Sequence, residues 1–193
     1  MRITEAKARE NREKIVAVAA ELFRRRGFDG IGVGDLMKAA GFTHGGFYNH
    51  FGSKDALSAE ALDQAFRAMD AERARAPSLE VLLKAYLSDA ARRAPERSCP
   101  AAALAGDVAR QPQEVKQVFA EGLERILASL GEHLEDEPDR RAAAIDLFAR
   151  MAGAMMLARA TPAESGLGEE ILGVVLRSCL EEIGADQTSQ AIT

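Results

Sequence analysis

The sequence predicts an all-α protein of about nine helices, and three observations support this fold class. Apolar residues recur at three- and four-residue spacing along most of the chain, which is the period of a helix. No segment alternates apolar and polar residues between hairpin turns, as a strand would. Apolar residues make up 47% and charged residues 28% of the 193 positions, a composition typical of folded chains.

Four helices are predicted in the first 77 residues, each bounded by residues that favour helix ends. Gly27 follows three arginines and ends the first helix, and Gly41 ends the second. Thr43 and Ser53 are expected to cap the third and fourth helices with their hydroxyl groups. These four segments are residues 5–26, 33–40, 43–51 and 53–76.

Five further helices are predicted in the rest of the chain. Ser78 is placed to cap the first of them, and Pro100 lies in the first turn of the second. Pro112 ends that helix and begins the third, and Pro162 with Gly166 separates the last two. The predicted segments are residues 78–92, 99–110, 112–130, 138–160 and 167–183.

Charge is distributed unevenly along the chain. The net charge of −5, taken alone, argues against a nucleic-acid partner. Residues 1–54, however, carry ten Lys and Arg against six Asp and Glu, whereas residues 55–193 carry fifteen against twenty-four. This asymmetry indicates a basic binding module joined to an acidic body. We therefore predict two domains, residues 1–54 and residues 55–193.

Residues 33–54 have the pattern of a helix-turn-helix. Two short helices flank Gly41, and a glycine there permits the left-handed backbone of a tight turn. The second helix of such a unit enters the major groove of DNA with its first residues against base edges. Phe47 and Phe51 are expected to anchor this helix in the core. Tyr48 is assigned to a phosphate contact, with a core position as the alternative.

The residue types of the second helix suit contact with DNA. Thr43 and His44 lie at its amino end, whose partial positive charge favours phosphate. Gly45 and Gly46 let the backbone approach DNA closely, at a cost in helix stability. Lys54, at the start of the next helix, suits a phosphate. The candidate DNA-binding residues are Thr43, His44, Gly45, Gly46, Tyr48, Asn49, His50 and Lys54.

The span from Gly27 to Leu57 closely resembles the amino-terminal domain of the TetR/AcrR transcriptional regulators. It combines an Ala-Ala-Gly turn with a Gly-x-x-Tyr-x-x-Phe-x-x-Lys run, formed here by Gly45, Tyr48, Phe51 and Lys54. The resemblance covers residues 10–60 well; the remainder matches only in helix number and length. It implies a homodimer that binds a palindromic operator and acts as a repressor or, alternatively, an activator. It further implies a carboxy-terminal domain that binds a small-molecule effector.

Two positions depart from the family pattern. Members usually have Ser or Thr as the cap of the helix before the turn, often with a basic residue shortly after. Gly32 and Gly34 occupy those positions here, so fewer phosphate contacts are expected from that helix. A basic arm then gains importance as a minor-groove contact, against the alternative that it is only solvated. The arm comprises Arg2, Lys7, Arg9 and Arg12.

The last two helices carry more apolar side chains than one buried stripe requires. This excess favours a four-helix dimer interface, two helices from each subunit, over a pair of helices buried centrally in one subunit. Gly153 is expected to allow close approach between helices. The candidate interface residues are Phe148, Met151, Met155, Ile171, Val174, Val175 and Cys179.

An effector pocket is expected among the helices that precede the last one. Most of its candidates equally suit a plain apolar core. Cys99 lies at a helix start, where the helix dipole lowers a thiol pKa, so a redox or electrophile sensor is weighed against an inert buried thiol. The candidate effector-binding residues are Tyr86, Leu87, Cys99, Leu104, Val108, Phe119, Leu123 and Met151.

The sequence argues against an enzyme. It contains no nucleophile elbow, phosphate-binding glycine loop or metal-ligand spacing, so no cofactor or metal is expected. The amino terminus lacks a signal-peptide core and no apolar run would span a bilayer, which predicts a cytoplasmic protein with no membrane partner. The remaining alternative is a helical interaction protein of the same fold without DNA binding.

Overall fold

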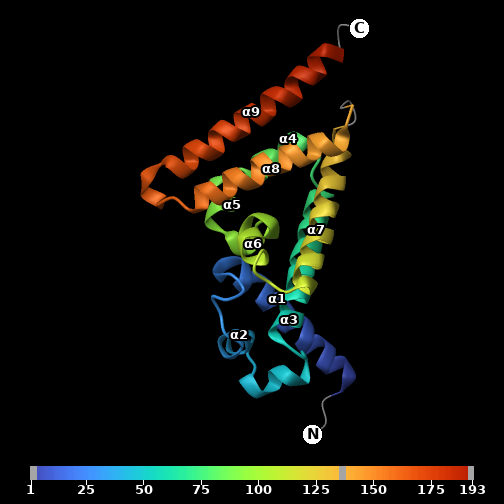
Figure 1. Ribbon diagram of the computed structural model, residues 1–193, viewed down its shortest axis with the longest axis vertical. Helices are drawn as coiled ribbons and strands as arrows, with labels where there is room; N and C mark the ends of the chain where they lie inside the picture. The colour runs from blue at the N-terminus through green and yellow to red at the C-terminus, as the bar shows by residue number, and fades with distance from the viewer. Residues whose placement is uncertain (1–3, 135–137, 191–193) are drawn as a thin grey trace. The chain divides into compact units, whose positions relative to one another are not determined.

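The chain folds into helices throughout residues 4–134 and 138–190, the part described by the computed structural model (Figure 1). Nine α-helices and three short 3-10 helices lie in that part, which confirms the predicted fold class. They are α1 (Glu5–Arg26), α2 (Val33–Ala40), η1 (His44–Asn49), α3 (Lys54–Arg73), α4 (Leu79–Tyr86), α5 (Asp89–Arg93), η2 (Pro95–Arg97), α6 (Pro100–Val108), α7 (Gln113–Gly131), α8 (Arg140–Arg159), η3 (Ala163–Ser165) and α9 (Leu167–Gln190).

Packing divides the chain into two compact units. The first unit comprises Met1–Met69 with Pro95–Gly122, and the second comprises Asp70–Ala94 with Leu123–Thr193. These units describe how segments pack, whereas the predicted division after residue 54 concerns separate functions. That functional division stays a prediction.

The first unit is built around α1. This helix packs against α2, η2 and α6, and its inward face is wholly buried at Ile15, Ala19 and Phe23. The ring of Phe23 lies 5.1 Å from that of Phe28, which continues the core past the glycine stop. Helix α2 covers the residues predicted for it, and its Leu36 is completely buried. The short helices are thus held by burial rather than by their own length.

Several helix ends lie where the sequence places them. The Ser53 hydroxyl accepts a 3.0 Å hydrogen bond from the Ala56 amide, and the Ser78 hydroxyl accepts one of 3.3 Å from the Val81 amide. Gly27 and Gly41 adopt φ angles of +74° and +85°, in the left-handed region that favours glycine. These predicted caps and stops are confirmed.

The single helix predicted for residues 78–92 is instead two helices, α4 and α5. The Ser88 hydroxyl accepts a 3.1 Å hydrogen bond from the Ala91 amide and so caps a new helix. The apolar spacing does not reveal this break, because Leu79, Leu83 and Leu87 keep a four-residue interval and are all buried.

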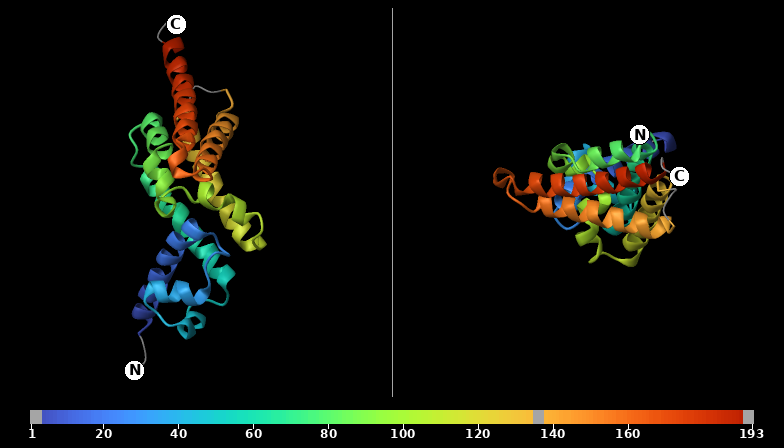
Figure 2. Two further views of the ribbon diagram at one scale, coloured as in Figure 1. Left: turned by 90° about the vertical axis from the view of Figure 1, so that its left-hand side faces the viewer. Right: turned by 90° about the horizontal axis from the view of Figure 1, so that it is seen from above.

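The second unit contains an antiparallel hairpin of α8 and α9, joined through η3, and the two helices run beside each other in both views of Figure 2. Helix α5 is fastened to the end of α8. The buried Arg92 donates to the Ala158 carbonyl over 3.3 Å, and Arg159 donates to the Ala91 carbonyl over 2.9 Å. Gly168 lies against this contact, where a Cβ atom would sit 2.6 Å from the Arg92 guanidinium.

Substitution of Gly122 by alanine tests the packing of the first unit. A Cβ added at Gly122 would lie 2.3 Å from the ring of the fully buried Phe66. Replacement of a mid-helix glycine by alanine ordinarily stabilises by about 0.5–1 kcal/mol. For Gly122→Ala we expect the opposite sign, a loss of about 1–3 kcal/mol in the free energy of unfolding, because the core becomes overpacked.

The matched control for Gly122→Ala is Gly106→Ala in α6, where an added Cβ meets nothing within 4 Å. Urea unfolding of both variants measures the difference. Equal stabilisation by the two substitutions would contradict the packing described here.

Candidate nucleic-acid interface

The turn after α2 sets the direction of the segment that follows it. Gly41 has a left-handed backbone, and its amide donates to the Lys38 carbonyl over 3.0 Å. The Phe42 amide donates to the Met37 carbonyl over 2.8 Å and so closes the end of the helix. The turn predicted for the helix-turn-helix is therefore confirmed.

The residues Thr43–His50, which we term the η1 segment, differ from the predicted α-helix. The structure has a 3-10 helix over His44–Asn49, and two consecutive glycines explain the weak preference for an α-helix. The Thr43 side chain makes no capping hydrogen bond, contrary to prediction. Because a 3-10 helix of six residues aligns few peptide dipoles, the dipole argument for phosphate at Thr43 and His44 is correspondingly weaker.

Two phenylalanines anchor the η1 segment to the first unit. Phe47 is 1% exposed and Phe51 3% exposed, with ring centroids 5.5 Å apart, which confirms their predicted place in the core. Tyr48 is 69% exposed, so the alternative of a core position for Tyr48 is wrong. The Tyr48 ring lies edge-on to the buried Phe47 ring, with centroids 5.2 Å apart. This contact fixes the orientation of the exposed tyrosine side chain and its hydroxyl group.

The other candidate DNA-binding residues also reach the surface to some degree. Thr43, His44, Gly45 and Asn49 are exposed, and Gly46, His50 and Lys54 are half-buried. Exposure allows the predicted contacts, and the individual roles stay predictions.

The fold does not require glycine at Gly45 or Gly46. Neither residue has a positive φ angle. A Cβ added at Gly45 would meet nothing within 4 Å, and one at Gly46 would be 3.6 Å from the Thr43 hydroxyl, an ordinary contact. Gly45 therefore leaves open backbone on the outer side of the segment, whereas a Cβ on Gly46 would also lie 3.7 Å from the buried Met37.

Arg12 does not extend into solvent as part of a basic arm. Its guanidinium donates to the His50 carbonyl and to the Glu60 carboxylate, and it lies 4.4 Å from the centroid of the Phe51 ring. Glu60 is not predicted from the sequence, because residues 48 positions apart carry no local pairing signal. Of the predicted arm, Lys7 pairs with Glu10 at 2.8 Å, Arg9 is exposed, and Arg2 lies outside the described residues.

The predicted dimer-interface residues fall into two groups. Phe148, Met151, Met155 and Cys179 are buried within the second unit. Ile171 and Val175 are half-buried, and Val174 is 49% exposed. The exposed apolar side chains of the same two helices are Ile145, Met156, Leu157, Leu167 and Val174. A partner could contact this second group, and the interface itself stays a prediction.

Gly153 shows no close helix approach among the described residues, since an added Cβ would meet nothing within 4 Å. The α8–α9 pair is instead bridged by charge: Arg150 donates to both carboxylate oxygens of Glu182, at 2.8 and 2.6 Å. This hydrogen bonding lowers the pKa of Glu182 and raises that of Arg150. Cys179 lies in the same hairpin, and burial raises the pKa of its thiol.

The candidate effector-binding residues are divided between the two units. In the first unit Cys99, Leu104 and Val108 are buried, and Phe119 lies edge-on to Phe66 at 5.8 Å. In the second unit Leu87 and Met151 are buried, Leu123 is half-buried, and the Tyr86 ring lies 6.3 Å from Phe148. Their role in binding an effector stays a prediction.

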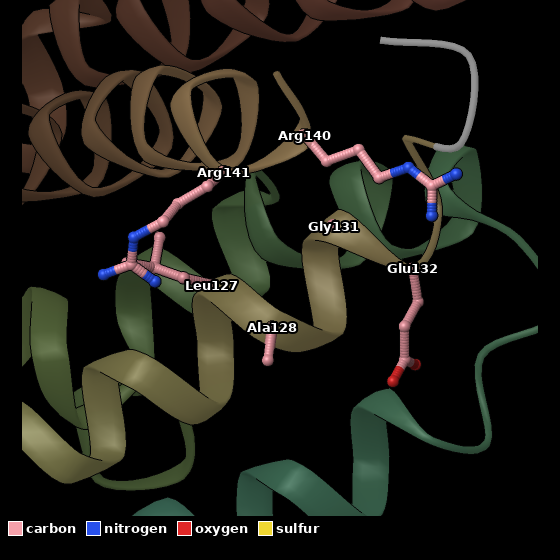
Figure 3. A pocket seen from close by; sticks show the side chains of 6 residues that line it. All are labelled: Leu127, Ala128, Gly131, Glu132, Arg140 and Arg141. Atoms are coloured by element: carbon pink, nitrogen blue, oxygen red, sulfur yellow. The ribbon is translucent and has the colours of Figure 1, made fainter. Parts of the chain in front are cut away.

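A hollow of about 290 Å³ opens in the second unit, at the end of α7 and the start of α8 (Figure 3). None of the effector candidates lines it. Arg141, on its wall, makes two 2.8 Å hydrogen bonds to Glu124, which lower the pKa of that carboxyl. The lining residues are Leu127, Ala128, Gly131, Glu132, Arg140 and Arg141.

Across residues 4–134 and 138–190, no group of three His, Cys, Asp or Glu side chains is arranged to hold a metal ion. Within the described helices, none combines the length and apolar character needed to cross a membrane.

The amino-terminal segment matches a known family. Residues 15–61 match the model for bacterial regulatory proteins of the tetR family. The repressor NemR of Escherichia coli is 36% identical over 59 residues, which cover 31% of this chain and 30% of NemR. The repressor DhaR of a Mycobacterium species is 36% identical over 69 residues, covering 36% of this chain and 34% of DhaR. The chain thus spans about a third of the length of these curated relatives.

Solved structures match over nearly the whole chain. A TetR-family regulator from Agrobacterium tumefaciens has a TM-score of 0.75 at 22% identity, over 91% of this chain and 98% of its own. A TetR regulator from Chloroflexus aurantiacus has a TM-score of 0.68 at 25% identity, over 89% and 95%. These likenesses define the class as an all-helical protein with an amino-terminal helix-turn-helix. Residues 15–61 thus carry the sequence pattern of the tetR family, and the described chain has the fold of solved TetR-family regulators.

The burial of both cysteines predicts slow thiol chemistry. Cys99 is 3% and Cys179 1% exposed, and the raised pKa of Cys179 keeps its thiol protonated near neutral pH. Because the thiolate is the reactive form, we expect a disulfide reagent at pH 8 to label the native protein at least about 100-fold more slowly than the unfolded chain.

Cys99→Ser and Cys179→Ser assign the two thiol signals separately. Rapid stoichiometric labelling of Cys99 in the native protein would favour the sensor alternative over an inert thiol.

Proposed function

We propose that the protein is a homodimeric transcriptional repressor, acting in the cytoplasm, that binds a palindromic DNA operator and is released by a small-molecule effector. The observation that carries the proposal is the η1 segment. It presents Tyr48 at 69% exposure from a base of two buried phenylalanines, directly after a left-handed glycine turn. Beyond its edge contact with Phe47, this ring is left to solvent, so packing alone does not explain an aromatic residue at this position.

The geometry supports different roles for the exposed side chains of the η1 segment and for Lys54. Tyr48, with its exposed hydroxyl, and Lys54, at the start of α3, suit phosphate oxygens that fix the position of the protein. His44 and Asn49 are exposed and carry groups that hydrogen-bond base edges in the major groove. The open backbone at Gly45 permits the close approach that such contacts need.

Repression is favoured over activation by the relatives. NemR and DhaR are both named transcriptional repressors, and AcrR of Shigella flexneri, 41% identical over 59 residues, is named a transcriptional regulator.

A two-fold dimer would present two η1 segments to half-sites about 34–36 Å apart, or a multiple of that spacing. The exposed apolar side chains of α8 and α9 provide a surface on which such a dimer would form.

The proposal is tested by titrating the protein against the DNA that flanks its own gene, in a gel-shift assay at several salt concentrations. We expect submicromolar binding that weakens steeply as salt rises, because phosphate contacts release counterions. Sedimentation of the same sample reports whether the bound species is a dimer. An absence of binding to any fragment, with or without extracts containing small molecules, would favour the interaction protein without DNA binding.

Substitutions in the η1 segment and at Lys54 should separate affinity from sequence preference. Tyr48→Ala and Lys54→Ala are expected to weaken binding to all DNA roughly alike, because phosphate contacts carry no sequence information. His44→Ala and Asn49→Ala are expected to cost about 1–3 kcal/mol on the preferred operator and to relax the preference at particular base pairs. Binding to a set of single-base operator variants measures both effects. A uniform loss in all four variants would show that the base contacts are assigned wrongly.

Gly45→Ala should separate DNA binding from stability. A Cβ at this position meets nothing within 4 Å, so we expect the free energy of unfolding to stay unchanged or rise by up to about 1 kcal/mol. DNA affinity should fall at least about tenfold, which is 1.4 kcal/mol, because the methyl group would stand between backbone and duplex.

Gly106→Ala serves as the control for Gly45→Ala, since it makes the same substitution in an open position of α6. It should leave DNA affinity unchanged. Full affinity in Gly45→Ala would show that close backbone approach at this residue is not used.

A further inference from the structure

One side chain of α1 joins three elements: α1 itself, the η1 segment and α3. Arg12 lies on α1, the His50 carbonyl that accepts from it ends the η1 segment, and the Glu60 carboxylate lies on α3. The guanidinium also covers the face of Phe51, the residue that follows the segment. A single planar group therefore makes two hydrogen bonds and a cation–π contact at one point.

The His50 carbonyl needs a donor from outside its own helix. The amides of His50 and Phe51 both donate to the Phe47 carbonyl, at 2.9 and 3.0 Å, and this closes the 3-10 helix. The carbonyl groups beyond that point have no partner within the helix and must be satisfied elsewhere.

The amino end of the η1 segment has no such capping bond, since the Thr43 hydroxyl does not cap it. Just before that end, Lys14 of α1 lies 5.5 Å from the centroid of the Phe42 ring. Two cations of α1 thus rest on the two aromatic residues that bracket the segment, and only Arg12 adds directional hydrogen bonds.

We propose that Arg12, oriented by Glu60, is the positioning residue that fixes the η1 segment against α1 and α3 and so sets where its DNA-contacting side chains lie. This inference rests on the proposed function and adds residues that touch no DNA. The pair is only partly buried, with side chains 37% and 40% exposed, so it contributes little to global stability. The Arg12–Glu60 pair instead affects the local order of the η1 segment, which has only a weak helix preference.

Substitution of Glu60 tests the proposal by the direction in which DNA affinity changes. Removal of a carboxylate from a DNA-binding surface ordinarily tightens binding, because repulsion of phosphates is reduced. If Glu60 orients Arg12, Glu60→Gln must instead weaken binding, by about three- to tenfold. Arg12→Lys keeps the charge but loses the planar fork, and should weaken binding by a similar factor.

The matched control is Glu13→Gln, which removes the same charge from the position next to Arg12. Glu13 is exposed and forms no ion pair with any residue that the structure describes. This variant should bind DNA as tightly as the unmodified protein or somewhat more tightly.

Two readouts are measured on the full chain: affinity for the fragment bound by the unmodified protein, and hydrogen exchange of peptides covering residues 42–52 and 113–131. We expect at least about tenfold faster exchange over residues 42–52 in Arg12→Lys and Glu60→Gln, with α7 unchanged. The double variant should lose no more affinity than the weaker-binding of the two single variants, because both act through one contact.

An unchanged or raised affinity in Glu60→Gln, like that of Glu13→Gln, overturns the proposal whatever the exchange rates. If the unmodified protein binds no DNA, the proposed function fails, and exchange alone decides the role of Arg12. Faster exchange confined to residues 42–52 then supports positioning of the segment, and unchanged exchange overturns it.

Discussion

The burial of Phe47 and Phe51 is the interaction on which the proposed DNA-binding surface depends. The η1 segment between Gly41 and α3 is short, contains two adjacent glycines and lacks a side-chain cap at its start, so it would not keep its shape alone. Two rings buried in the first unit supply the free energy that the backbone does not. The side chains between them are thereby presented outward, with Tyr48 braced on the edge of Phe47.

Phe47, Phe51 and Arg12 hold the η1 segment in place, and none of them is among the exposed residues on its outer side. The residues that stabilise the segment therefore differ from those that form its surface. The anchors point inward or toward α1, whereas Thr43, His44, Gly45 and Asn49 face solvent. Substitutions on the outer side can therefore change the side chains that the segment presents to solvent with little effect on folding.

The sequence was sufficient to predict features that follow from local chemistry. Helix α2, the left-handed Gly41 and the buried Phe47 and Phe51 were all predicted, since periodicity and glycine geometry act within a few residues. The 3-10 form of η1 was not, because helix spacing does not distinguish it from a short α-helix. The Arg12–Glu60 contact and the Cβ-sized gap that Gly122 leaves for Phe66 depend on residues far apart in the chain. Such contacts become visible only when the elements are packed in space.

The exposure of Tyr48 also gives the protein an intrinsic optical signal. The chain has two tyrosines and no tryptophan, so its near-ultraviolet emission comes from Tyr48 and Tyr86. Tyr86 is half-buried in the second unit beside Phe148, whereas Tyr48 lies in the open on the η1 segment. Quenching by a water-soluble agent will therefore fall mainly on Tyr48, and whatever covers this ring will shield it. The η1 segment thus carries its own fluorophore, and its occupancy can be followed without a label.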